Sequence, residues 1–297
     1  MSEMIKVQEV LESADVNYGA FLIYSEVIEG TRRPLVFGET IMEDFSLVGE
    51  TGTTIKVPTA TQLSATKVTS SIETTLASGM NVTDKTISST SVTVTVFIYC
   101  AVALSDILIE DYPKLNLFRL NLRNAGKAVM EQIDADIESC YAAGYGVLHT
   151  CATIDFDEVS DAIAKLENED WYVGDVQPFL IISPDVAADL KQDDKFVVCE
   201  EFYGANSPER RKGVQGVYAG CRVLKTSLLN DTGRAYIVMP SNTENGPVAI
   251  LAWKRRVRVK SERYENKEHT FVAVTARVAP TVIQSTGICR INITTTP

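Results

Sequence analysis

The sequence contains little of what most enzymes and metal sites require. It has two histidines, and no G-x-S-x-G turn lies near either, so a nucleophilic pair of Ser or Cys with His is not indicated. Six cysteines are scattered without a C-x-x-C pair, which together with the scarcity of histidine makes a zinc site improbable. A G-x-x-x-x-G-K-[ST] phosphate loop is also missing. We therefore expect no catalytic residues, no cofactor-binding residues and no metal ligands.

Long apolar runs are missing as well. No stretch of about 18 apolar residues appears, so we expect no membrane span. Residues 1–8 are polar and charged, unlike a signal peptide, which favours a protein made in the cytosol with free, mostly buried thiols. The net charge of -11 and the pI near 4.8 argue against nucleic-acid binding across the whole surface.

Two weak signals for chemistry have simpler explanations. Gly213, Gly216 and Gly220 in GVQGVYAG faintly resemble a dinucleotide fingerprint, but they run from a polar loop into a predicted strand, not from a strand into a helix. The clustered acidic residues fall on helix faces or ends, where a solvated surface explains them better than paired-carboxylate catalysis. An enzyme is not indicated, and a soluble α/β enzyme is kept only as the rival from another class.

The strongest pattern in the chain predicts one long helix from about Tyr112 to Ala143. Apolar positions recur there every three or four residues, while charged side chains take the other side. Asp111 is placed as an N-cap, Pro113 in the first turn, and Gly144 and Gly146 as stop signals. The residues expected to form its buried face are Leu115, Phe118, Leu122, Val129, Ile133 and Ile137.

Residues 50–95 are rich in Ser and Thr and poor in charge. The segment GTTIKVP alternates like a strand, and SVTVTVFIYCAVA from Ser91 alternates better, with Val92, Val96 and Ile98 on one face. Two such strands predict a long antiparallel ribbon whose outer half lacks the apolar residues for a core. It is either a surface loop or a ribbon that becomes ordered on another subunit. Its charged residues are Lys56, Lys67, Glu73, Asp84 and Lys85.

After the long helix the pattern changes to alternating helices and strands. A helix is predicted after Asp155 and Glu158, which have capping-box spacing, and a second, short helix after Ser183. PFLIIS predicts a buried strand, and further strands are predicted at Val217–Leu224 and Ala235–Met239. A polar loop from Glu200 to Gly213 precedes them and contains Glu201, Asn206, Glu209, Arg210, Arg211 and Lys212.

From Val248 onward the chain is predicted to be nearly all strand. AILAWKRRVRVKSERY, TFVAVTARVAPTVIQS and CRINITT are expected to return beside the long helix as a helix-on-sheet layer. In the first of these, Arg256, Arg258 and Lys260 share one face. They either pair with the excess carboxylates of this chain, within or between subunits, or contact the phosphates of packaged nucleic acid. The basic strand comprises Lys254, Arg255, Arg256, Arg258 and Lys260.

The order of these parts resembles the major capsid protein of tailed viruses, which has the Hong Kong 97-type shell fold. The Ser/Thr-rich ribbon is similar to that family's extended loop, and LSDILIEDYPKLNLFRLNLRNAGKAVMEQIDADIESCYAAGYG is similar to the approach to the spine helix and the helix itself. GVYAGCRVLKTS is the most specific local segment and belongs to a stretch that resembles the axial domain.

The resemblance implies an α+β fold with an N-terminal arm, an extended two-stranded loop, a long spine helix with a peripheral β-sheet, and an α/β axial domain. The implied boundaries are 1–45 for the arm, 46–95 for the extended loop, 96–150 for the peripheral domain with the spine helix, 151–247 for the axial domain, and 248–297 for the closing strands of the peripheral domain.

The resemblance also implies a coat protein that self-assembles into pentamers and hexamers of an icosahedral shell around viral double-stranded DNA. The ribbon would lie across a neighbouring subunit, and the Glu200–Gly213 loop would lie at the capsomer centre. Partners would be other copies of the chain, a scaffolding protein where one is used, portal and minor or decoration proteins, and weakly contacted DNA, but no membrane. The protein would assemble in the host cytoplasm and reside in the virion. An encapsulin-type nanocompartment shell is the alternative with the same fold.

Overall fold

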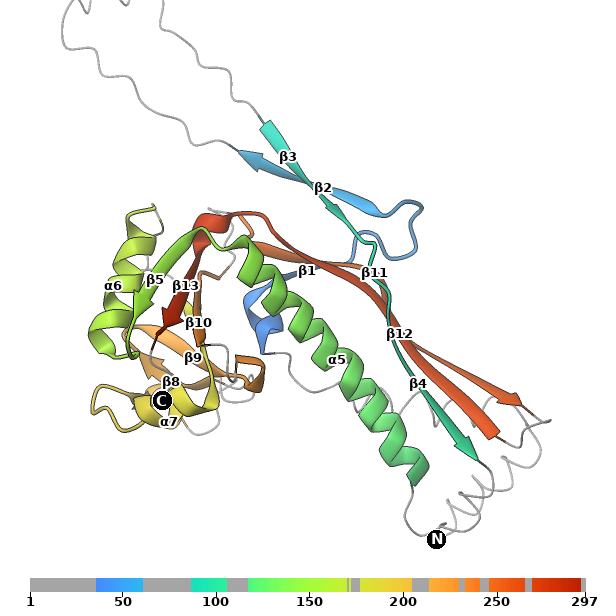
Figure 1. Cartoon of the computed structure of the whole chain (residues 1–297). Helices are drawn as coiled ribbons and strands as arrows, with labels where there is room; N and C mark the ends of the chain where they lie inside the picture. The colour runs from blue at the N-terminus through green and yellow to red at the C-terminus, as the bar shows by residue number, and fades with distance from the viewer. Residues whose placement is uncertain are drawn as a thin grey trace, which may run out of the picture.

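The structure is a computed structural model that describes residues 36–60, 87–105, 117–169, 171, 177–204, 214–229, 233–240, 246–264 and 269–294. A long helix runs beside a four-stranded sheet, a seven-stranded sheet lies at one end of that helix, and a two-stranded ribbon projects beyond both (Figure 1). None of the described helices combines the length and hydropathy that a membrane span needs. The expected α+β class is confirmed.

The long helix is α5, Leu117–Gly144, and its 28 residues span about 42 Å. Leu122, Val129, Ile133 and Ile137 are all buried along one face. The helix ends where a Cβ added to its last residue, Gly144, would lie 2.8 Å from the Val282 side chain, so only glycine fits this approach. Of the other expected positions, Asp111, Pro113 and Leu115 lie outside the described residues, and the Phe118 side chain is likewise not described.

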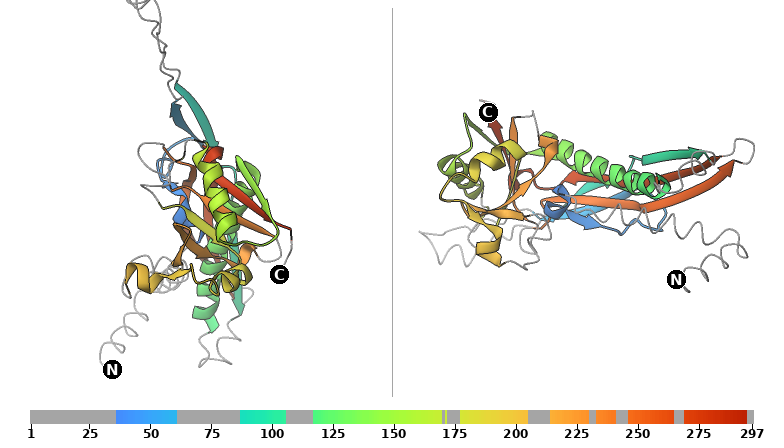
Figure 2. Two further views of the ribbon diagram at one scale, coloured as in Figure 1. Left: turned by 90° about the vertical axis from the view of Figure 1, so that its left-hand side faces the viewer. Right: turned by 90° about the horizontal axis from the view of Figure 1, so that it is seen from below.

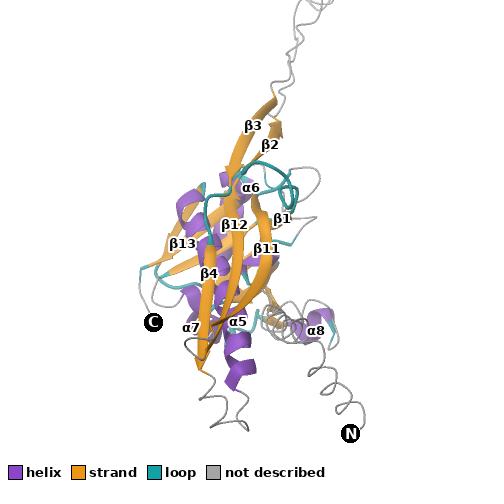
Figure 3. Cartoon of the chain, turned by 90° about the vertical axis from the view of Figure 1, so that its right-hand side faces the viewer, coloured by secondary structure: helices purple, strands orange, loops and turns teal. Residues whose placement is uncertain are grey.

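The four-stranded sheet lies against α5 and has the order β1 (Met42–Asp44), β11 (Ala249–Tyr264), β12 (His269–Val282) and β4 (Ile98–Ser105). β11 and β12 form a long antiparallel hairpin, while β1 joins β11 in parallel. Figure 3 shows β4, β12 and β11 in front of α5, so the helix covers one face of the sheet, and none of the described helices covers the other. This arrangement is the expected helix-on-sheet layer.

The seven-stranded sheet has the order β5 (Val147–Cys151), β13 (Ile288–Ile293), β10 (Arg234–Val238), β6 (Phe179–Ile182), β9 (Cys221–Lys225), β8 (Val214–Tyr218) and β7 (Val197–Val198). The helices around it are α6 (Phe156–Glu167), α7 (Pro184–Leu190) and α8 (Cys199–Tyr203), with 3-10 turns η3 (Ser227–Leu229) and η5 (Ser285–Gly287). All four residues of β6 are buried, as predicted for PFLIIS.

The predicted starts of α6 and α7 are confirmed by their caps. The Asp155 carboxylate accepts a hydrogen bond from the Glu158 amide at 2.9 Å. The Ser183 hydroxyl accepts one from the Val186 amide, directly before Pro184. Each cap uses a donor that an isolated helix end leaves unpaired, which explains why the helices begin at these residues.

The single strand predicted from Ser91 through Ala103 is wrong. The chain forms β3 (Ile87–Thr93), leaves regular structure between Val94 and Phe97, and then forms β4. The two strands belong to different sheets, because β3 pairs with β2 (Thr54–Ala60) and β4 pairs with β12. The alternating pattern therefore breaks at Val96, which is 45% exposed.

The strand predicted at Val217–Leu224 is also wrong, because it is a hairpin of β8 and β9. The turn between them consists of Ala219 and Gly220, whose φ angles are 47° and 79°. Positive φ at both turn positions is the geometry of a tight two-residue hairpin. The pair Ala-Gly lacks the Asn or Asp that usually marks such a turn, so the pattern was mistaken for one continuous strand.

The last predicted strand does not return beside the long helix. β13 instead joins the seven-stranded sheet, between the antiparallel β10 and the parallel β5. The η5 turn separates it from β12 and redirects the chain. The closing strands from residue 248 are thus divided between two sheets, a long-range choice that alternation within a strand cannot reveal.

Three aromatic side chains, here called the junction cluster, pack together where η1 and α5 meet the seven-stranded sheet: Phe37, Tyr141 and Tyr236. Phe37 belongs to the short 3-10 turn η1, Phe37–Thr40, within the segment expected to form the N-terminal arm. Its ring lies 5.9 Å from that of Tyr141 and 6.3 Å from that of Tyr236, both edge-on. All three side chains are fully buried, so η1, α5 and β10 share one core.

Asp134 of α5 fixes η1 against the helix. Its carboxylate accepts hydrogen bonds from the amides of Val36, at 3.1 Å, and Phe37, at 2.9 Å. Burial raises the pKa of Asp134 to about 6, although the backbone hydrogen bonds oppose that shift. The segment before β1 is therefore held by a buried acid as well as by packing.

Candidate assembly surfaces

The ribbon of β2 and β3 is the first candidate surface. The strands pair antiparallel from Thr54↔Thr93 to Ala60↔Ile87, and among the described residues no third strand joins them. Its two outer edges therefore present unpaired backbone groups, the feature by which a strand pairs with another chain. Lys56 lies exposed on this ribbon. The other charged residues expected there lie outside the described residues: Lys67, Glu73, Asp84 and Lys85.

The base of the ribbon is anchored by a small apolar cluster, here called the ribbon-base cluster: Leu47, Val57, Val92, Val94, Ile250, Ala252 and Ala279. Ile250 and Ala252 contribute from β11, whereas the alternate residues Ala249 and Leu251 belong to the main core. The cluster thus lies on the opposite face of β11 from the main core. The ribbon is fixed at its base and projects from there (Figure 1).

The first part of the basic strand has a local structural role. Lys254 Nζ donates to the carbonyl oxygens of Leu47, at 3.3 Å, and of Glu50. The Arg256 guanidinium lies 4.4 Å from the centre of the Phe45 ring, a cation–π distance. These two side chains hold the segment between β1 and β2. Arg255 is half-buried.

Arg258 and Lys260, farther along β11, are exposed. Val257 and Val259 alternate with them and contact the main core, so the face predicted to carry the basic side chains is the open one. Ion pairs found in the described part of the chain are Lys127–Glu131, His149–Glu158 and Arg234–Glu138, and none involves either residue. Among the described residues, these two cations therefore have no ion-pair partner.

Aromatic side chains accompany them on the same open face. Phe97 and Tyr99 are 49% and 67% exposed, and their rings stack with centres 6.0 Å apart. Arg258 pairs with Thr275, which pairs with Tyr99, so all three lie on one face of the sheet. We call Phe97, Tyr99, Arg258 and Lys260 the outer patch.

Sequence reasoning missed the outer patch as a unit. The pattern joined β3 and β4 into one strand, so it did not bring either aromatic residue beside the basic strand. The signal that could have found the patch is the pair of large aromatic residues on the polar side of an alternating segment, where an ordinary solvent face carries polar residues.

The loop expected at the capsomer centre is described only at its start. Glu201 lies exposed in α8, so the segment begins as a helix and not as the loop predicted from Glu200. Phe202 beside it is 51% exposed. The remaining expected residues lie outside the described ones: Asn206, Glu209, Arg210, Arg211 and Lys212.

The long helix beside a four-stranded sheet, the projecting ribbon and the separate seven-stranded α/β layer together define the Hong Kong 97-type capsid fold. Solved structures with this arrangement are similar over nearly the whole chain. The capsid of Ralstonia phage GP4 has a TM-score of 0.66 and 11% identity, with 90% of this chain and 92% of that one covered. The mature capsid of bacteriophage PhiM1 has a TM-score of 0.63 and 10% identity, covering 88% and 87%.

A cellular shell protein is similar to the same extent. The SrpI encapsulin of Synechococcus elongatus has a TM-score of 0.60 and 10% identity, covering 88% of this chain and 87% of that one. By sequence, no family model and no curated protein matches this chain. At such low identity the likeness shows the fold, and the predicted fold class is confirmed.

Proposed function

We propose that this chain is the major capsid protein of a tailed virus, which assembles into pentamers and hexamers of an icosahedral shell around double-stranded DNA. The observation that carries the proposal is the structural match of 88–90% of this chain to phage capsid structures. A projecting two-stranded ribbon with open edges has no evident purpose in a monomer but suits a subunit that overlaps its neighbours.

The ribbon supplies the intersubunit contact in this proposal. β2 and β3 extend from the ribbon-base cluster, and their free edges pair with the backbone of an adjacent subunit. Each contact is weak, but symmetry repeats it throughout the shell, so the closed particle is stable. The segment from α8 to β8 takes the position at the capsomer centre.

The outer patch gives the second contact. Exposed aromatic rings next to exposed cations suit an interface with another subunit, because the rings supply buried area and the cations find carboxylates on an acidic partner. With a net charge of -11, a second copy of the chain is such a partner. If this face instead points toward the genome, Arg258 and Lys260 contact phosphates without reading sequence.

The remaining partners follow from the shell. A scaffolding protein where one is used, a portal and minor or decoration proteins would meet the assembled subunits, and the protein would be located in the virion after assembly in the host cytoplasm.

The proposal is tested by negative-stain electron microscopy of the purified chain, with light scattering on the same sample. Closed shells or capsomer rings are expected. A monomer at every concentration, including after addition of a candidate scaffold, would contradict it and favour a soluble α/β enzyme.

An encapsulin-type compartment is the second candidate, supported by the similarity to the SrpI shell. The same particles distinguish the two. Nuclease-protected DNA inside particles from the native source indicates a virus, whereas a co-purifying enzyme without nucleic acid indicates a compartment.

A further inference from the structure

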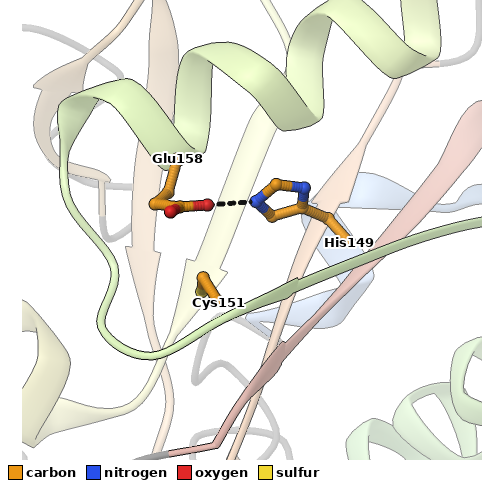
Figure 4. Close-up of side chains that lie close together, drawn as sticks. All are labelled: His149, Cys151 and Glu158. Atoms are coloured by element: carbon orange, nitrogen blue, oxygen red, sulfur yellow. Dashed lines mark hydrogen bonds and ion pairs between the residues drawn. The ribbon is translucent and has the colours of Figure 1, made fainter.

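Three metal-ligating side chains lie together where β5 meets α6. His149 and Cys151 are two residues apart on β5, on its buried face, and are 6% and 5% exposed. Glu158, in the first turn of α6, lies opposite them (Figure 4). One possible ligand atom from each of the three lies within 4.8 Å of the other two.

The backbone around this cluster is already fixed. β5 pairs in parallel with β13 over its whole length, with Ile291 opposite His149 and Ile293 opposite Cys151. The Asp155 cap holds the first turn of α6 and with it Glu158. A strand and a capped helix therefore hold the three ligands, so little ordering is needed to bring them together.

The side chains of His149 and Cys151 make few polar contacts outside this cluster. His149 Nε2 lies 2.5 Å from Glu158 Oε2, while His149 Nδ1 is buried without a hydrogen-bond partner among the described residues. No second hydrogen bond therefore fixes the ring. The Cys151 thiol contacts the Asn292 carbonyl oxygen at 3.9 Å, which is a long and weak interaction.

The local charge favours a cation as well. The carboxylates of Glu158 and Asp155 lie close enough to act on the Cys151 thiol, and their negative potential attracts a divalent metal ion.

We propose that His149, Cys151 and Glu158 bind one zinc ion, with a water molecule as the fourth ligand. Imidazole, thiolate and carboxylate suit Zn²⁺, whereas Mg²⁺ and Ca²⁺ prefer oxygen ligands alone. Bonds of about 2.0–2.3 Å place tetrahedral ligand atoms about 3.3–3.8 Å apart. The short contact between Glu158 and His149 would have to open on metal binding, and the Glu158 side chain, which is 36% exposed, has space on its solvent side for that movement.

This ion would fasten an edge of the seven-stranded sheet. β5 is the outermost strand and has β13 as its partner on one side. A metal that joins it to α6 cross-links an edge strand to the helix that covers it, and so opposes local opening. The site is a property of the folded subunit, independent of shell assembly.

Cobalt(II) is the probe that reports on the thiolate directly. Added to the purified full-length chain after treatment with EDTA, it should bind with one equivalent per chain and give a thiolate-to-cobalt charge-transfer band that zinc then removes. Cys151→Ser should abolish the band. Cys140→Ser removes a half-buried thiol on α5 and should leave the band unchanged.

Zinc affinity tests the carboxylate. Glu158→Gln keeps a hydrogen-bonding group beside His149 but removes the charge, and should weaken zinc binding by more than about 10-fold while circular dichroism stays native. Zinc should raise the Tm of the wild-type chain by several degrees but not that of Cys151→Ser. Absence of cobalt binding, or a thiolate band that survives Cys151→Ser, would overturn the proposal.

Discussion

The two large sheets differ in how completely this chain covers them. The central strands of the seven-stranded sheet are buried on both faces, as in β6 and β10, where nearly every residue is buried. The outer half of β11 in the four-stranded sheet instead alternates between the core and solvent. The central strands of the seven-stranded sheet are thus buried within the subunit, whereas the four-stranded sheet presents an open face with exposed aromatic and basic side chains. Figure 2 shows from two further sides how the four-stranded sheet and α5 extend away from the seven-stranded sheet. The covered sheet stabilises the subunit, and the open face of the other sheet is the surface proposed to meet a partner.

The buried face of α5 is tested by placing a charged side chain on it. Leu122→Asp or Val129→Asp should prevent soluble folding, because a carboxylate buried without a partner costs more than about 4 kcal/mol. Soluble expression and circular dichroism measure the effect. Leu120→Asp, on the same helix but at a 52% exposed position, is the matched control and should remain folded. Native folding of the Leu122 or Val129 variant would contradict the assignment of the buried face.

The projecting side is tested by shortening the ribbon. Ala60 and Ile87 pair across its end, so a two-residue Asn-Gly turn can replace residues 61–86. We expect a folded, soluble subunit that cannot form shells, because the ribbon-base cluster remains intact. Thermal unfolding and electron microscopy on one sample distinguish lost assembly from lost folding. Intact particles from this variant would show that the ribbon is not the intersubunit contact.

The junction between the sheets is tested by pH. The folded pKa of Asp134, about 6, lies above the ordinary value of 3.8 for an aspartate, so the folded chain binds this proton more tightly than the unfolded chain. The stabilising contribution is complete below about pH 4 and is lost as pH rises through 6, by at most about 3 kcal/mol. Denaturant unfolding between pH 4 and 7 should show this loss in the wild type and not in Asp134→Asn.

Other acids add their own pH dependence, so the difference between variant and wild type is the quantity to compare. Asp136→Asn removes the same charge from the same helix without the two buried contacts, and is the control. If Asp134→Asn and the wild type change in parallel over this range, the buried acid does not contribute as described.

The open face is tested by reversing its charge. Arg258→Glu with Lys260→Glu should change the subunit's free energy of unfolding by less than about 0.5 kcal/mol, because both side chains are exposed. Assembly or DNA retention should nevertheless fall, most clearly at low salt. Lys225→Glu with Lys191→Glu reverses two exposed cations away from the outer patch, and is the control matched in net charge. Equal assembly by both variants would exclude the outer patch as an interface.

The elements predicted correctly are those whose signal is local. The buried face of α5 follows from spacing within one helix, and the starts of α6 and α7 follow from Asp155 and Ser183 in capping positions. β6 follows from a continuous apolar run. In each case the residues that carry the signal also make the contact.

The elements predicted wrongly depend on partners far away in the chain. β3 and β4 read as one strand because their patterns agree, although their partners lie in different sheets. β13 follows β12 in sequence but pairs with β10 and β5. The site formed by His149, Cys151 and Glu158 joins a strand to a helix, and neither segment alone has the spacing of a metal motif.

The junction cluster also sets an order of events in folding. Phe37 and its neighbours contact α5 about a hundred positions later, as in the hydrogen bond from Phe37 to Asp134. The Phe37 ring also packs against Tyr236 of β10. In the same way, β1 pairs with β11, where Met42 lies opposite Ile250. During synthesis this early segment therefore has no place to dock until most of the chain has emerged. The first described residues are among the last to become fixed, and their docking completes the joint between the two sheets.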